Sequence, residues 1–171
     1  MSKATRCFWG LLVALAGVGF SGSRAEAQDR TGYVGQSVIL PYQFNPTTGR
    51  GDSAYAIDIG MALTERWFGR ASVEFALQGA GRIGLAVGPE VYFGLPWMIK
   101  PLATVQALYV FSPTSDFGVR GAIGAEWNLK FLTGIDNLRF TLQSGVLAIL
   151  KRQVRNQIYW ETARAGFSWN F

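Results

Sequence analysis

The residues of this sequence that could do chemistry are four carboxylates and three arginines, spaced along otherwise apolar segments. They are Asp58, Glu74, Glu90, Arg120, Glu126, Arg139 and Arg164. Two carboxylates could act as general acid and base, but no nucleophile or base partner accompanies them. The near balance of charge favours a network of ion pairs, because a charge held away from water without a partner is costly. We therefore expect a structural network, extended by Thr104, Gln106, Thr141 and Gln143.

The composition also argues against catalysis and metal binding. The chain has no histidine and a single cysteine, Cys7. It therefore lacks the commonest general base and metal ligand, and a thiol is available only near the N-terminus. The formal net charge of +5 is not gathered into a dense basic cluster of the kind that follows a phosphate backbone. We expect no catalytic residues, no cofactor, no metal and no nucleic-acid partner.

The elements that must position the charged residues are β-strands. After residue 28, apolar and polar residues alternate in blocks of about ten residues, as in "YAIDIGMAL". Clusters of turn residues such as "SPTSD" and "TGIDN" separate the blocks. Pro41 makes the first strand uncertain, and Pro89 and Pro101 predict bulges, because proline cannot donate a ladder hydrogen bond. The predicted strands are 34–43, 54–64, 70–78, 82–93, 100–111, 116–129, 137–150 and 156–171.

Alternation alone does not say which face lies inside. A soluble barrel or sandwich turns its apolar face inward, whereas a membrane barrel turns it toward lipid. Here the polar face is small and charged, and Trp67, Trp97, Trp127 and Trp169 fall near one predicted rim, as an interfacial girdle requires. The sequence therefore predicts an all-β protein: a single antiparallel up-and-down transmembrane β-barrel of eight strands. An extracellular soluble barrel is the rival interpretation.

The N-terminus predicts export. Lys3 and Arg6 precede an apolar stretch from Cys7 to Phe20, which is followed by a small-residue site at Ala25 to Ala27. This arrangement is typical of a secretory signal peptide, and the apolar stretch is too short to span a membrane as a helix. We therefore expect residues 1–27 to be a signal peptide and residues 28–171 to form the barrel.

The last residues, "RAGFSWNF", resemble the C-terminal signature of bacterial outer-membrane barrels. Arg164, Gly166, Trp169 and Phe171 occupy its polar, glycine and two aromatic positions. The resemblance implies an outer-membrane location in a Gram-negative bacterium, and recognition by the barrel-assembly machinery. In size and strand number the chain is similar to the small OmpA/OmpX-type barrels. It departs from them in its short outer connections, and it lacks the histidine on which the lipid-modifying enzymes of that group depend.

One end of the predicted lumen is apolar. The inward positions near the outer rim are Leu108, Val110, Leu147, Ile149, Ile158 and Trp160. These residues could form a cup for a lipid tail or small apolar molecule. A packed cap that seals the barrel is the favoured interpretation, because small barrels fill themselves with side chains. A slip of one residue would turn such positions toward lipid.

Together these features predict a non-enzymatic outer-membrane barrel with a structural, anchoring or scaffold role. Its lumen is expected to be filled by side chains rather than open as a pore. Two alternatives remain: a small conduit or binder for apolar molecules, and the outer-membrane subunit of an envelope-spanning complex. The expected partners are outer-membrane lipid, the assembly machinery during biogenesis, and a periplasmic protein docked at the periplasmic turns.

Overall fold

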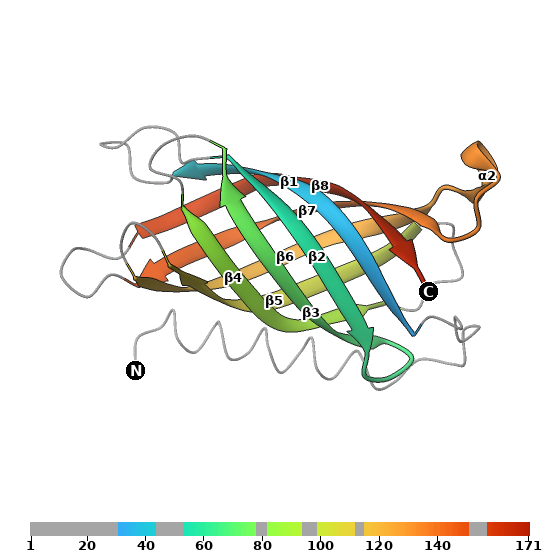
Figure 1. Cartoon of the computed structure of the whole chain (residues 1–171), viewed down its shortest axis with the longest axis horizontal. Coiled ribbons are helices and arrows are strands. Elements are labelled where there is room, and N and C mark those ends of the chain that lie inside the picture. Colours follow the sequence, from blue (N-terminus) through green and yellow to red (C-terminus); the bar gives the residue numbers. More distant parts are fainter. Residues whose placement is uncertain (1–30, 44–52, 78–81, 94–98, 112–114, 151–156) are drawn as a thin grey trace.

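The computed structural model describes residues 31–43, 53–77, 82–93, 99–111, 115–150 and 157–171. Their eight strands form a closed barrel in which each strand pairs antiparallel with its neighbours in the sequence (Figure 1). A short helix, α2 (Lys130–Thr133), lies in the turn between β6 and β7. The strands are β1 (Gly32–Gln43), β2 (Ala54–Ala62), β3 (Trp67–Ala76), β4 (Ile83–Tyr92), β5 (Ile99–Val110), β6 (Asp116–Asn128), β7 (Leu138–Leu150) and β8 (Gln157–Asn170). The predicted fold class is confirmed.

The barrel closes between its first and last strands. β1 pairs with β2 on one side and with β8 on the other, so the uncertain first strand is confirmed and begins at Gly32. At the end of the ladder, the Phe171 carbonyl accepts from the amides of Thr31 and Gly32 at 3.0 and 3.1 Å. This end of the barrel, which also carries α2, is called the C-terminal end (Figure 1).

The outer face is apolar and the inner face polar. On β2, Ile57, Ile59 and Met61 are 43%, 50% and 54% exposed, whereas Asp58 between them is only 4% exposed. This is the inverse of a soluble barrel and is typical of strands that face lipid. Within the described residues, no helix has the length and apolar character needed to cross a membrane.

Aromatic side chains gather on the outer face at the C-terminal end. The ring of Phe140 lies between those of Trp127 and Phe167, with centroids 5.7 and 5.3 Å apart. Such a band suits a membrane interface, where aromatic rings are enriched. Trp97, predicted to join this rim, lies outside the described residues.

The strand register shifts at one place, on β8. Arg164 pairs with Ile39 of β1 and Gln143 of β7, but Glu161, three residues away, again lies in the barrel interior. An extra residue at 162–163 therefore forms a β-bulge, which reverses the alternation of faces along the strand. The bulges predicted at Pro89 and Pro101 are wrong. Pro89 pairs with β3 and Pro101 with β6 in unshifted register, and the β4–β5 ladder skips Gly88 and Pro89 but resumes in the same register.

Candidate functional site: a polar lumen and an apolar cup

All seven predicted network residues point into the barrel, where none is more than 7% exposed. Two further charged residues belong with them, Arg70 on β3 and Glu161 on β8, at 5% and 1% exposed. Arg70 shares the face of Ser72 and Glu74, so its position in the alternation was sufficient to identify it. Glu161 could not be identified in that way. Strict alternation counted from Arg164 would place it on the outer face, but the bulge at 162–163 turns it into the lumen.

Asp58 accepts hydrogen bonds from four side chains on three other strands. Its Oδ2 accepts from Ser37 Oγ at 2.7 Å, and its Oδ1 accepts from Ser72 Oγ at 2.5 Å. The same Oδ1 lies 2.6 Å from Arg164 Nη2 and 3.1 Å from Arg70 Nη2. A buried carboxylate is stable only with such partners, so Asp58 holds β1, β3 and β8 against β2.

Arg120 connects opposite walls of the barrel. From β6 it donates through Nη1 and Nη2 to the two carboxylate oxygens of Glu74 on β3. Its Nε donates to Glu161 Oε1 on β8 at 2.6 Å. The fork-shaped contact with Glu74 uses the planar geometry of the guanidinium and is the stronger kind of charged hydrogen bond. Because these strands are not neighbours, the contacts run across the lumen.

A second group of contacts lies nearer the C-terminal end. Arg70 Nη1 donates to Glu90 Oε2 at 2.8 Å, and the Tyr33 hydroxyl donates to Glu90 Oε1 at 3.0 Å. The Tyr92 hydroxyl lies 2.8 Å from Glu90 Oε1 and 3.0 Å from Glu126 Oε2, and so bridges the two carboxylates. Arg139 Nε is 3.9 Å from Glu126 Oε1, which makes it the loosest ion pair of the network.

The network crosses the lumen without a break in its contacts. Gln143 Oε1 accepts from Arg70 Nη1 at 3.2 Å, and Gln106 Oε1 accepts from Arg120 Nη1 at 3.3 Å, so the two predicted glutamines take part. Thr104 is 3% exposed and Thr141 is half-buried. Among the described residues, no group of three or more His, Cys, Asp or Glu side chains is placed to hold a metal ion. The arrangement is suited to holding the barrel wall together.

Apolar clusters lie on both sides of the network. At the C-terminal end, Phe68 packs between Tyr33 and Tyr92, with ring centroids 6.3 and 5.3 Å apart, beside the buried Leu102. At the opposite end, the residues in contact are Ala86, Leu108, Val110, Leu147, Ile149 and Tyr159. The second cluster, with the pocket beside it, is called the cup.

The cup contains four of its six predicted residues. Leu108, Val110, Leu147 and Ile149 are between 4% and 8% exposed and point inward. The prediction is wrong for Ile158 and Trp160, which are 50% and 42% exposed on the outer face. The bulge on β8 is the physical reason, because it places Tyr159 in the lumen instead.

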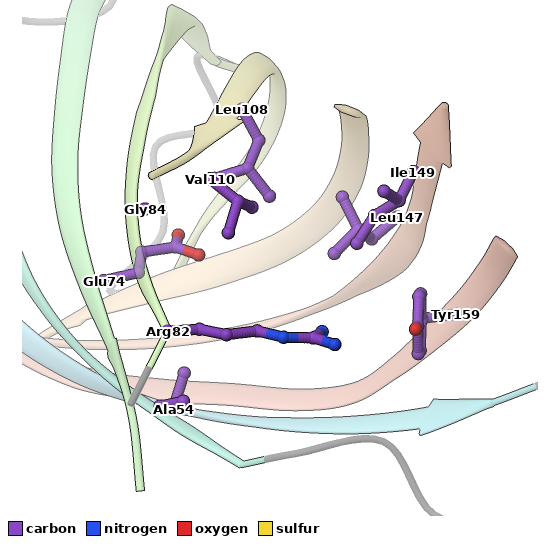
Figure 2. A pocket seen from close by; sticks show the side chains of 10 residues that line it. Ala54, Glu74, Arg82, Gly84, Leu108, Val110, Leu147, Ile149 and Tyr159 are labelled. Carbon is purple, nitrogen blue, oxygen red and sulfur yellow. The ribbon is translucent and has the colours of Figure 1, made fainter. Parts of the chain in front are cut away.

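A cavity of about 90 Å³ lies in the cup. Figure 2 shows Glu74 and Arg82 among the mainly apolar side chains around it. The lining residues are Ala54, Glu74, Ala76, Arg82, Gly84, Leu108, Val110, Leu147, Ile149 and Tyr159.

The tail residues divide between the two faces of β8. Arg164 and Gly166 are buried in the lumen, whereas Trp169 and Phe171 are 46% and 56% exposed on the outside. A Cβ atom added to Gly166 would lie 2.5 Å from the carbonyl oxygen of Gln36 and 2.7 Å from Ser37 Cβ. Glycine therefore allows β8 to approach β1 closely where the barrel closes. The role of these residues as an assembly signal stays a prediction, and the predicted signal peptide 1–27 lies outside the described residues.

The closed eight-stranded barrel, with its apolar exterior and charged interior, defines a small transmembrane β-barrel. Solved structures of that class resemble it. The N-terminal β-barrel domain of Pseudomonas aeruginosa OprF matches with a TM-score of 0.58 and 14% identity, over 84% of this chain and all (100%) of that one. Neisserial surface protein A (NspA) matches with a TM-score of 0.58 and 13% identity, over 82% of this chain and 97% of that one. A de novo designed transmembrane β-barrel gives a TM-score of 0.58 and 14% identity, over 85% and 99%.

No model of a known protein family matches the sequence, and no curated protein matches it. The chain has the fold of the small outer-membrane barrels of OmpA/OmpX-like architecture. At sequence identities of 13–14%, the similarity to these structures concerns the fold alone.

Proposed function

We propose that the protein is an integral barrel of a Gram-negative outer membrane with a structural, anchoring role, and that its own side chains fill its lumen. The observation that supports this proposal is the polar network. Side chains from all eight strands take part in it, and Arg120 alone links β6 to three other strands. Eight strands enclose an interior that side chains are just able to fill. A barrel filled in this way resists deformation and offers no continuous path for solutes.

Export and insertion complete the proposal. The signal peptide 1–27 would direct the chain out of the cytoplasm, and the assembly machinery would recognise Trp169 on β8 and Phe171 directly after it. The C-terminal end would then face the periplasm. There, Phe131 and Leu132 of α2 are 64% and 69% exposed and would be available to lipid or to a periplasmic protein.

Fractionation and conductance test the proposal. The protein should be recovered with the outer membrane and should migrate differently on a gel before and after boiling, because a closed barrel resists detergent. In planar bilayers it should give no discrete conductance steps, with a general porin as the positive control. Recovery from the soluble periplasm would exclude the membrane class, whereas steady conductance would exclude only the filled lumen.

A second candidate function, a binder for small apolar molecules, is favoured by one observation. The cavity of the cup is bordered by four inward aliphatic side chains and meets the polar network at Glu74. Concave apolar sites with few polar groups are typical ligand sites.

A further inference from the structure

Arg82 gives the cup a positive charge. It directly precedes β4, where Ile83 is 42% exposed on the outer face and Gly84 is buried in the lumen. The same alternation turns Arg82 inward. It lines the cavity and is half-buried, and Figure 2 shows its side chain extended into the pocket, with the guanidinium toward the wall formed by Tyr159.

The other charged residue of the cup is already paired. Glu74 receives both terminal nitrogens of Arg120, and Arg164 Nη1 lies 3.5 Å from its Oε1. The Arg82 guanidinium, in contrast, has no hydrogen bond or ion pair with any residue that the structure describes. It stands beside aliphatic side chains, where an unpaired charge is less favourable than in water.

The charges that point into the lumen balance one another. The network has five carboxylates, those of Asp58, Glu74, Glu90, Glu126 and Glu161, and four guanidinium groups, those of Arg70, Arg120, Arg139 and Arg164. The half-buried Lys100 lies directly opposite Glu126 in the register of β5 and β6 and supplies a fifth positive charge. At the cup end Arg82 adds a positive charge, and the half-buried Asp116, opposite Val110 in the register of β5 and β6, adds a negative one, so these charges balance.

We propose that the cup binds a small amphiphilic anion, whose carboxylate or phosphate pairs with Arg82 while its short apolar tail lies against the aliphatic residues. A guanidinium recognises either group through two parallel hydrogen bonds. The cavity of about 90 Å³ is partly open, so a short tail can lie against the aliphatic side chains and continue past them. This inference rests on the second candidate function and adds the charge of the ligand.

The test uses the full-length mature protein in phosphatidylcholine nanodiscs, with ¹³C-labelled methyl groups observed by NMR. Hexanoate is titrated against the methyl signals of Leu108, Val110, Leu147 and Ile149, with hexanol and hexylamine as neutral and cationic probes of the same chain length. Hexanoate should give saturable shifts at these methyls. Its dissociation constant should be at least about tenfold lower than those of hexanol and hexylamine, the difference expected for one charge-assisted hydrogen-bonded contact.

Variants assign the effect to single residues. Arg82→Gln should weaken hexanoate binding at least about tenfold and make it similar to hexanol binding. Arg66→Gln removes the same charge from the turn before β3, at the C-terminal end, and should bind like the wild type. Val110→Phe, which fills the cup and keeps Arg82, should abolish the shifts. Trp160→Ala alters the outer face and should leave them unchanged. The gel mobility of the unboiled protein verifies that each variant is folded.

The outcomes separate the inference from the function on which it rests. If hexanol binds as tightly as hexanoate, the cup is an apolar site, and the inference that its ligand is an anion is refuted. If none of the probes gives saturable shifts, both the binder function and the inference are refuted. Lysophosphatidic acid added to the nanodiscs distinguishes the source: methyl shifts with this lipid support an anion taken from the membrane, and shifts with hexanoate alone support a free acid.

Discussion

Replacing Arg120 with methionine tests whether the polar network is closed to water. Arg120 is 1% exposed and pairs with two carboxylates, Glu74 and Glu161. After the replacement Glu74 keeps Arg164, whereas Glu161 has no second cation among the described residues. Removing one partner of a buried ion pair costs about 3–5 kcal/mol, because the other charge stays buried without compensation. We expect the free energy of unfolding to fall by that amount, mainly through Glu161.

The assay is a urea titration of the folded barrel in detergent micelles, followed by tryptophan fluorescence and by gel mobility. The double variant Arg120→Met/Glu161→Gln should regain most of the lost free energy, because it removes the unpaired charge itself. Lys130→Met is the matched control. Its Nζ lies 2.5 Å from Asp136 Oδ1, but the two side chains are 62% and 65% exposed, so the loss should not exceed about 1 kcal/mol.

The difference in unfolding free energy between Arg120→Met and Lys130→Met decides whether the network is closed to water. A loss below about 1 kcal/mol for Arg120→Met, equal to that of an exposed pair, would mean that water reaches Glu161. The proposal of a filled lumen would then be wrong. If Arg120→Met loses much unfolding free energy and the added Glu161→Gln does not restore it, Arg120 stabilises the barrel mainly by packing.

Three further predictions concern the barrel wall. Gly166→Leu should lower the amount of protein in the outer membrane, measured by immunoblot, because any side chain there meets the β1 backbone; Ala165→Leu on the same strand should reach wild-type levels, and equal levels for both would contradict the argument. Gly60→Ala should cost about 1–3 kcal/mol in the same urea titration, the range for an overpacked interior, because its methyl group would overlap the ring of Tyr33. Deletion of Phe171 should impair assembly, visible as accumulation in the periplasm, whereas wild-type membrane levels would contradict the assembly-signal hypothesis.

Most of the fold can be predicted from the alternation of apolar and polar residues and from the turn residues that separate the alternating blocks. The predicted strands 116–129 and 137–150 differ from β6 and β7 by a single residue at one end, because turn residues such as those in "SPTSD" bound them clearly. Alternation also assigned the seven charged residues to the inner face. It could not pair them, because the period of a strand gives a side chain's face but not its height in the barrel. The contact between Arg120 and Glu74, 46 residues apart, depends on the registers of all the strands between them.

The β8 bulge could not be predicted from the alternation of apolar and polar residues. Without the extra residue at 162–163, Arg164 would fix the faces of the strand, and Glu161 would face lipid while Trp160 entered the lumen. A carboxylate facing the hydrocarbon is costly, and Glu161 would lose its contact with Arg120. With the bulge, Glu161 completes the network, Tyr159 lines the cup and Trp160 faces outward. The choice depends on a partner on β6, about 40 residues earlier in the chain, where Arg120 lies. No local pattern in "ETARAG" carries that information, whereas Pro41 lies at the register shift on the paired strand β1, where a proline cannot donate a ladder hydrogen bond.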